Sequence, residues 1–326
     1  MSAQSRITPA NPAFAALSLL LKEKLSRWGI GSNEVLIVAC SGGCDSMVLL
    51  HLLVANGYNA EVAHVNYHLR GSASELDEAL VRETADGLKL PFHLADGRDA
   101  IPPQGNNLQE NARRFRYAFF ERLRRERKAR AVLTAHHEND VAETFLLNLL
   151  RGAGLNGLSG IPEQNNEVLR PLLQANKQSL LQAAVEMGIR WREDDSNAET
   201  KYRRNQIRHD WLSKLQQLEP DIVEKLAKTA LRMKKTADVV EELLEREQPS
   251  RPMPENAVFE VAIARIAESA QPDTLLFLFV RRFGFSATQC AEATQNLTPS
   301  RGKHWKSTSH TLWRKGGYFT VYQGIN

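Results

Sequence analysis

The sequence has few cysteines, no long apolar run and little net charge. Its three cysteines, Cys40, Cys44 and Cys290, form neither a Cys-x-x-Cys pair nor a zinc-ligand spacing, which is typical of a reducing compartment. No apolar run approaches the ~20 residues that a membrane-spanning helix needs, so we expect no membrane contact and a cytoplasmic location. A formal net charge of +4 does not indicate nucleic-acid binding, which would have to come from local basic clusters.

The length and composition favour two domains. The 326 residues exceed what one hydrophobic core usually serves, and 42% of them are hydrophobic, which is enough to build cores. Residues 1–12 are polar, contain proline and lack an apolar signal core, so we expect a loose tail there.

A glycine-rich segment between an apolar run and a helical pattern is the most informative stretch. Residues 35–40 are apolar and largely β-branched, which predicts a strand buried on both faces of a parallel sheet. Residues 41–46, here called the glycine loop, interrupt this run, and a helical spacing of apolar residues follows. Such a loop directs backbone N–H groups and the positive end of a helix dipole at one point, where an anion can bind. The Walker pattern is absent from the sequence, so no Walker lysine is placed to bind phosphates.

The glycine loop resembles the signature of the PP-loop ATP pyrophosphatases, which cleave ATP between its α and β phosphates. Its residues are Ser41, Gly42, Gly43, Cys44, Asp45 and Ser46. The resemblance implies that the two serines and the two glycines bind the pyrophosphate, that Cys44 fills the variable position, and that Asp45 holds Mg²⁺, an ion that prefers oxygen ligands. The alternative is an ordinary tight turn between a strand and a helix.

Apolar runs along the first two thirds of the chain predict an α/β fold with a doubly wound, mostly parallel sheet. Further strands are expected at residues 60–66, 90–94 and 131–135, and helices at residues 14–28, 76–88, 108–128 and 177–187. Ligands of such sheets bind beyond the carboxyl ends of the strands. We therefore expect His64, Asn66, His68 and Arg70 near a site, although a polar loop at the strand end would look the same. A strand end does not fix the two histidines on one face, so we expect no metal site there.

Two carboxylates follow the strand expected at residues 131–135. On a helix that starts there, His136, Asp140 and Glu143 share one face at i, i+4 and i+7. The pair suits binding of an ammonium group or positioning of Mg²⁺, but it is also the acidic first turn that a helix dipole favours. A zinc-protease pattern is excluded because Val141 stands where the second histidine would be.

Three other segments carry glycines or arginines. Residues 152–157 match Gly-x-Gly-x-x-Gly, but an apolar helix rather than a strand precedes them, so we expect a flexible loop instead of a dinucleotide fingerprint. The basic run at residues 122–130 is either a solvated helix end or a contact for a phosphate backbone. Arg203, Arg204 and Arg208 either pair with acids on a helix face or contact phosphates.

Several motifs in a fixed order resemble the tRNA(Ile)-lysidine synthetases over roughly residues 30–235. Besides the glycine loop, they lie at residues 63–66 with 69–71, 110–113 with 116–117, 136–137 with 140 and 143–144, 151–155, 157–162, 170–172, 195–197 and 204–208. Two positions depart from the family pattern. Tyr67 and then His68 stand where the family often has a histidine, and Asn139 precedes Asp140 where the family commonly has two aspartates.

The resemblance implies a two-step ligation. The 2-carbonyl oxygen of a cytidine, at the first anticodon position of an isoleucine tRNA with a CAU anticodon, would attack the α-phosphorus of ATP and release pyrophosphate. The ε-amine of free L-lysine would then displace AMP. The residues implied in catalysis are Asp45, Asp140, Glu143, Arg113 and Arg208, and those implied in ATP binding are the six of the glycine loop with His64 and Asn66. Asp140 and Glu143 would hold the lysine, and a carboxylate or His137 would accept its proton.

The order of segments predicts a catalytic domain at residues 1–215, a helical bridge at residues 216–248 and a small tRNA-binding domain at residues 249–326. A Pro-rich linker is expected at residues 248–256, and apolar helices at residues 258–269 and 274–283. The basic and aromatic end, from Arg301 to Tyr318, suits RNA contact, although an ordinary surface is an alternative. Longer family members carry a further domain, so we expect a shortened form. The oligomeric state stays open, with a homodimer as one option.

Three rival functions deserve comparison. A PP-loop tRNA thiolation enzyme needs a sulfur-bearing cysteine or paired Cys-x-x-Cys motifs, which the sequence lacks. An amide-forming PP-loop ligase usually brings a glutaminase domain or another ammonia source. A non-enzymatic ATP-binding module would leave the acidic and arginine motifs unexplained.

Overall fold

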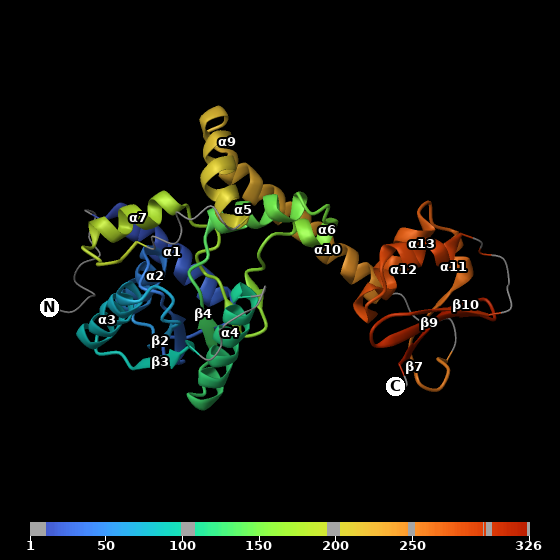
Figure 1. The fold of residues 1–326 in the computed structure, drawn as a ribbon, viewed down its shortest axis with the longest axis horizontal. Coiled ribbons are helices and arrows are strands. Elements are labelled where there is room, and N and C mark those ends of the chain that lie inside the picture. Colours follow the sequence, from blue (N-terminus) through green and yellow to red (C-terminus); the bar gives the residue numbers. More distant parts are fainter. Residues whose placement is uncertain are drawn as a thin grey trace. The chain divides into compact units, whose positions relative to one another are not determined.

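The computed structural model describes residues 11–98, 108–193, 203–246, 252–295, 297 and 302–324. The chain divides into two compact units, Met1–Lys235 and Thr236–Asn326, which are drawn in Figure 1. The expected tail at residues 1–10, the motif at residues 195–197, part of the Pro-rich linker, the side chain of Arg203 and all of Arg301 lie outside the described residues. No helix in the described ranges combines the length and apolarity needed to cross a membrane.

The first unit is built on a six-stranded sheet with the order β3-β2-β1-β4-β6-β5. The strands are β1 (Leu36–Ala39), β2 (Ala60–Asn66), β3 (Phe92–Asp96), β4 (Ala131–Leu133), β5 (Gln164–Asn165) and β6 (Val168–Leu169). Neighbouring strands pair in parallel except β5 and β6, which are antiparallel. The prediction of a doubly wound, mostly parallel sheet is therefore confirmed.

Helices cover both faces of this sheet. The helices of this part of the unit are α1 (Pro12–Arg27), α2 (Cys44–Ala55), α3 (Ser72–Gly87), α4 (Leu108–Glu126), α5 (Glu138–Leu149), α6 (Leu155–Leu158) and α7 (Lys177–Glu186). Those that pack on the sheet are α1, α2, α3, α4 and α7. Leu36 and Val38 of β1 pack with residues of α1, α2, α3 and α7, whereas Ile37 packs with residues of α4. Successive residues of a strand point to opposite faces, so a strand buried on both sides must be apolar throughout. This explains the unbroken apolar run that predicted β1.

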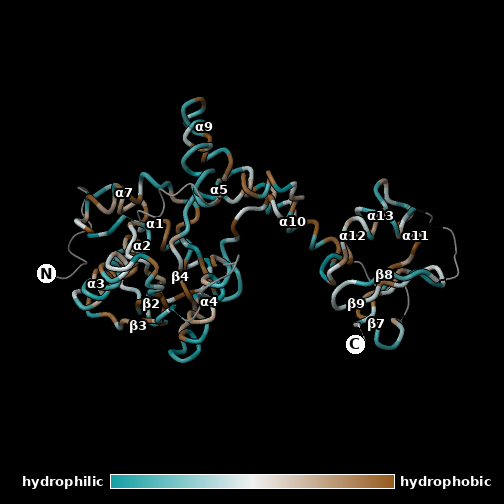
Figure 2. Tube along the Cα trace, viewed as in Figure 1, coloured by the Kyte–Doolittle hydropathy of each residue, from teal (hydrophilic) through white to brown (hydrophobic). Residues whose placement is uncertain are grey.

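A helical segment completes the first unit. It comprises α8 (Arg203–Gln206), the π-helical turn η4 (Ile207–Leu212), α9 (Ser213–Leu218) and α10 (Ile222–Glu245), which ends in the second unit. Ile207, Leu212 and Ala230 form a hydrophobic cluster with Val141 and Phe145 of α5. Figure 2 shows hydrophobic and hydrophilic residues alternating along α10, as an amphipathic helix requires.

The second unit contains a four-stranded antiparallel sheet with the order β7-β10-β9-β8. Its elements are β7 (Ala257–Ala262), α11 (Ile263–Ala267), α12 (Pro272–Val280), the 3₁₀ turn η5 (Arg281–Phe283), α13 (Ala287–Thr294), β8 (Lys303–Lys306), β9 (His310–Lys315) and β10 (Tyr318–Gln323). Trp305, Leu312 and Phe319 of the sheet share one buried core with Leu276 and Phe279 of α12.

One predicted element of this unit is wrong. Residues 258–269 were expected to form a helix, but their first half is β7, which pairs with β10, and the helix α11 begins only at Ile263. The apolar residues of this stretch fit a strand as well as a helix, and a partner strand about 60 residues later in the chain decides between them. The basic and aromatic end of the chain likewise forms β8, β9 and β10.

The turn from β1 to α2 depends on glycine at position 42. Gly42 has φ +89°, a left-handed backbone conformation, although a Cβ there would meet its nearest atoms at an ordinary 3.5 Å. The constraint is therefore the backbone conformation rather than the lack of space. Strain from a left-handed residue with a side chain costs about 1–2 kcal/mol.

We predict that Gly42→Ala lowers the free energy of unfolding of the chain by about 1–2 kcal/mol, because alanine resists positive φ. Urea unfolding followed by circular dichroism measures this change. Gly87→Ala is the matched control, because Gly87 ends α3 with open space around it and should be neutral or slightly stabilising. Equal losses from the two substitutions would contradict the assigned role of Gly42.

Candidate functional site

A cavity of about 720 Å³ opens at the carboxyl ends of β1, β2 and β4. The strand order reverses between β1 and β4, and open α/β sheets bind ligands beside such a switch point. The predicted site residues that line the cavity are Ser41, Gly43, Asp45, Ser46, His64, Asn66, Arg70, His136 and Asp140. The sheet topology therefore brings together residues as far apart in the sequence as Ser41 and Asp140, as the expected fold required.

The glycine loop is closed by its own hydroxyl groups. The backbone N–H of Ser41 donates to Oγ of Ser46 at 3.2 Å, and the N–H of Gly43 donates to Oγ of Ser41 at 3.3 Å. Oγ of Ser46 in turn donates to the carbonyl oxygen of Gly43 at 3.0 Å. Residue 192, outside the loop, also holds it in place, because the backbone N–H of Arg192 donates to the carbonyl oxygen of Gly42 at 3.0 Å. The loop is thus preformed and presents two hydroxyls beside the start of α2.

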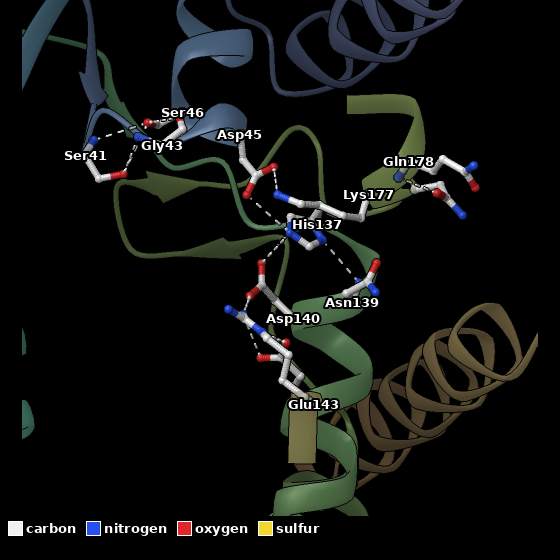
Figure 3. A network of polar contacts seen from close by, with 12 residues as sticks. Ser41, Gly43, Asp45, Ser46, His137, Asn139, Asp140, Glu143, Lys177 and Gln178 are labelled. Carbon is white, nitrogen blue, oxygen red and sulfur yellow. Dashed lines mark hydrogen bonds and ion pairs between the residues drawn. The ribbon is translucent and has the colours of Figure 1, made fainter. Parts of the chain in front are cut away.

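Asp45 lies at the centre of the polar network in Figure 3. Its Oδ1 is 2.6 Å from Nζ of Lys177, and its Oδ2 is 3.4 Å from Nε2 of His137. Burial raises the pKa of Asp45, but the contacts with His137 and Lys177 lower it more, and the pKa falls to about 2. Asp45 is therefore fully ionised at neutral pH.

His137 is held in one orientation at the start of α5. Its Nδ1 accepts a hydrogen bond from the N–H of Asn139 at 3.3 Å, and its own N–H donates to Oδ2 of Asp140 at 3.0 Å, which completes a capping box. Because Nδ1 is an acceptor, the ring proton belongs on Nε2, which faces Asp45 and Asp140. A neutral His137 has no free acceptor nitrogen, so this geometry favours a carboxylate over His137 as a proton acceptor.

Asp140 and Glu143 share two arginines. Nε of Arg204 is 2.8 Å from Oε2 of Glu143, and Nη2 of Arg204 is 3.1 Å from Oδ1 of Asp140. Nε of Arg208, on the π-helical turn, is 2.5 Å from Glu143. Glu143 is 1% exposed and does not line the cavity, whereas Asp140 does. Of the two interpretations of these arginines, pairing with acids is the one seen here, and the role of Glu143 in holding lysine stays a prediction.

Burial also sets the charge state of two histidines beside the cavity. Burial lowers the pKa of His136 to about 4, against the opposing charge of Asp140, and Nδ1 of His136 lies 2.9 Å from Oγ1 of Thr134. Burial likewise lowers the pKa of His64, whose Nδ1 is 2.8 Å from the carbonyl oxygen of Cys40. Both rings are neutral at pH 7. Asn66 is fixed by Glu78, to which its Nδ2 donates at 3.0 Å.

Other predicted residues lie away from the cavity. Arg113 is exposed, with its guanidinium 4.7 Å from the ring centre of Tyr117. His68 contacts Glu75 at 2.6 Å and Asp96 at 3.5 Å, while its neighbour Tyr67 lines the cavity. The arginines of the basic run at residues 122–130 form ion pairs with Glu121, Glu126, Glu61, Glu34 and Glu167. Residues 152–157 follow the helix α5, which confirms that they are no dinucleotide fingerprint.

Sequence reasoning missed Lys177 and gave Arg116 no role of its own. Arg116 lines the cavity from α4, and Lys177 contacts Asp45 from α7. Arg116 belongs to a motif quoted above, so its signal was present. Lys177 stands alone as the first residue of a helix 132 positions after Asp45, and only the fold brings the two together.

The cysteines near the loop are poor nucleophiles. Burial raises the pKa of Cys40 to about 12, and burial with the charge of Asp45 raises the pKa of Cys44 to about 11. Thiols with such pKa values are protonated at neutral pH, and sulfur chemistry needs the thiolate. Cys44 also does not line the cavity. Cys40 does line the cavity, but both thiols are weak nucleophiles.

The site suits a metal ion that arrives with its substrate. No group of three or more potential ligand residues occurs within the described parts of the chain. A single ionised carboxylate, Asp45, is however typical of Mg²⁺ sites in which substrate phosphates supply further oxygen ligands. The donor set thus fits Mg²⁺ bound with a nucleotide.

Comparison with known proteins supports two assignments along the chain. Residues 17–215 match the family model described as PP-loop domain, and residues 254–322 match the one described as TilS substrate binding domain. A tRNA(Ile)-lysidine synthase from Porphyromonas gingivalis is 34% identical over 92% of this chain, and one from Parabacteroides distasonis is 31% identical over 90%. The chain spans about two thirds of these relatives, 65% and 66% of their lengths.

One solved structure is similar in fold. It is the U34-tRNA thiolase NcsA from Methanococcus maripaludis with its 4Fe-4S cluster, with a TM-score of 0.54 and 15% sequence identity over 76% of this chain and 86% of that chain. At this identity the likeness concerns the fold alone.

We predict that Glu143→Gln lowers the free energy of unfolding by about 2–3 kcal/mol, because it leaves two guanidiniums beside a buried neutral side chain. Urea unfolding measures the loss. Glu83→Gln is the control, since Glu83 forms an exposed ion pair with Arg190 and should cost less than about 1 kcal/mol. A loss from Glu143→Gln no larger than that of the control would show that the network does not stabilise the fold.

The pKa of His136 predicts an acid-sensitive stability. Folding lowers this pKa from 6.5 to about 4. The contribution of the neutral ring to the free energy of unfolding is therefore complete above pH 6.5 and is lost as the pH falls toward 4. Between pH 7 and 4.5, the free energy of unfolding of the unaltered chain should fall by about 2 kcal/mol more than that of His136→Gln. Urea titrations at both pH values test this. His209→Gln, at an exposed position, is the control, and its free energy of unfolding should fall between the two pH values as much as that of the unaltered chain.

Proposed function

This chain belongs to the PP-loop domain family, and we propose that it is an ATP-dependent ligase that joins free L-lysine to the cytidine at the first anticodon position of isoleucine tRNA. The supporting observation is the glycine loop beside a cavity that also holds Asp45 and Asp140. Identity of 31–34% to tRNA(Ile)-lysidine synthases over 90% or more of the chain supports the choice of reaction.

ATP would bind with its phosphates at the glycine loop. The hydroxyl of Ser41, the N–H groups at the start of α2 and the helix dipole favour an anion there, and Ser46 could donate to it once its hydrogen bond to the carbonyl oxygen of Gly43 opens. Asp45 would hold Mg²⁺, which would stabilise the charge that develops on the departing pyrophosphate. His64 and Asn66, at the carboxyl end of β2, would contact the nucleotide from the other side of the cavity.

In the first step, the cytidine 2-carbonyl oxygen would attack the α-phosphorus while the bond from this phosphorus to the β-phosphate oxygen breaks. Arg116, which lines the cavity, is placed to offset negative charge on the α-phosphate. Arg113 and Arg208 are assigned the same task by family resemblance. Either of them would have to move, because Arg113 lies on an exposed face and Arg208 pairs with Glu143.

In the second step, the lysine ε-amine would form a bond to C2 of the cytidine as AMP leaves with the 2-oxygen, and the amine would lose a proton. Free lysine carries both ammonium and carboxylate groups. The network of Asp140, Glu143, Arg204 and Arg208 offers partners for both charges. Asp140 lines the cavity. Burial raises its pKa, but the charge of Arg204 and the hydrogen bond from the backbone N–H of His137 contribute to a net lowering, so Asp140 is ionised. We assign the proton to a carboxylate of this network.

The thiolation alternative is not favoured. Sulfur transfer needs a reactive thiol or a cluster ligated by cysteines, and the cysteines beside the cavity have raised pKa values. The unit that contains the TilS substrate binding domain match is proposed to contact the tRNA. The CAU anticodon, the cytoplasmic location and a homodimer stay predictions.

We predict that the chain, given ATP, Mg²⁺ and labelled lysine, incorporates label into an isoleucine tRNA transcript with cytidine at the first anticodon position and not into one with uridine. Acid-precipitable label and chromatography of AMP measure the two products. Asp45→Asn should reduce AMP formation by at least about 100-fold, whereas Asp86→Asn, at an exposed position of α3, should not. Label in both transcripts, or in neither with ATP intact, would contradict the proposal.

A further inference from the structure

Lys177 is a charged side chain in contact with Asp45 that the proposed mechanism does not yet use. It is the first residue of α7, and its Nζ lies 2.6 Å from Oδ1 of Asp45. The helix itself is firmly placed. Oδ1 of Asn176 caps it by accepting from the N–H of Gln178 at 2.7 Å, and Leu180 is buried in the main core. The side chain of Lys177 is nevertheless 43% exposed, so its ammonium end is accessible to solvent.

Both oxygens of Asp45 are occupied in this arrangement. Lys177 takes Oδ1 and His137 takes Oδ2 (Figure 3). Each carboxylate oxygen can accept more than one partner, but a metal cation on Asp45 would repel an ammonium that is 2.6 Å from the same carboxylate, so one of the two contacts is expected to open. His137 is 5% exposed and fixed by its capping box, whereas Lys177 has a flexible four-carbon stem and solvent access. Lys177 is therefore the partner that can leave.

An ammonium released from Asp45 would stay beside three helix starts. Residue 45 belongs to the first turn of α2, His137 caps α5, and Lys177 opens α7. The glycine loop itself supplies hydroxyls and N–H groups but contains no lysine or arginine. A departing pyrophosphate carries several negative charges, and lysine binds phosphate well as a compact point charge.

We propose that Lys177 is a pyrophosphate-binding residue, which pairs with Asp45 in the unliganded protein and donates to the β and γ phosphates once magnesium-bound ATP occupies the site. It thereby supplies the cation that the loop lacks. The inference rests on the proposed use of ATP. The inference predicts different effects on the two parts of ATP, because Lys177 would contact the leaving pyrophosphate and not the AMP portion.

The test measures binding of inorganic pyrophosphate with Mg²⁺, and separately of AMP, to the full chain by isothermal titration calorimetry. Lys177→Gln should weaken pyrophosphate binding by about 10- to 100-fold, the range for one lost charge-assisted hydrogen bond, and leave AMP binding unchanged. Lys177→Arg should restore part of the pyrophosphate affinity because it restores the charge. Lys22→Gln, at an exposed position of α1, should bind both ligands like the unaltered chain.

Three outcomes would overturn the inference. Pyrophosphate binding by Lys177→Gln equal to that of the unaltered chain would exclude a contact, and a loss shared equally by AMP would indicate general damage to the site. Circular dichroism and the Lys177→Arg variant guard against misfolding as the cause. Failure of the unaltered chain to bind either pyrophosphate or AMP would instead overturn the proposed function, and this inference with it.

Discussion

The ionised carboxylate of Asp45 is the constraint on which the rest of the site depends. A negative charge that is largely removed from water must be matched by donors, and here Lys177 and His137 provide them from two other elements. The first turns of α2, α5 and α7 therefore have to meet at one point. The sheet achieves this through its switch point between β1 and β4, and the buried apolar faces of α2 and α7 hold the helix starts in place. Electrostatics at the site and packing of the core thus require the same arrangement.

A second group of charged side chains adjoins the one around Asp45 and consists of Asp140, Glu143, Arg204 and Arg208. Asp140 joins the two, because it caps the backbone of His137 and also contacts Arg204. Arg204 and Arg208 come from α8 and the π-helical turn, so their pairing with Glu143 fixes this segment against α5. A π-helical turn is rare and often marks a functional position. Any ligand that binds Asp140 or Glu143 must compete with these guanidiniums, which couples ligand binding to the position of this segment.

Much of the first unit could be predicted from the sequence, because its signals are local and agree with one another. The apolar run of β1, the glycines after it and the helix that follows each point to the same strand, turn and helix, and β2 was predicted at its observed residues. The second unit was predicted less well. Residues 257–262 became a strand because β10 pairs with them, and no local pattern reports a partner that distant. Contacts such as that of Lys177 with Asp45 are hidden for the same reason, since tertiary structure alone creates them.

Cys44 is harder to interpret from the sequence than the serines beside it, because its burial is a property that only the tertiary structure sets. Its place inside the glycine loop is compatible with sulfur chemistry, and sequence alone could argue against this only by the lack of a second cysteine motif. Burial decides the matter, because it raises the pKa of Cys44 to about 11, and the charge of Asp45 acts in the same direction. The carboxylate that would serve phosphoryl chemistry therefore suppresses thiolate formation at the next residue. An ionised Asp45 therefore adds to burial in disfavouring a reactive cysteine at the next residue, and the same charge is the one proposed to hold Mg²⁺.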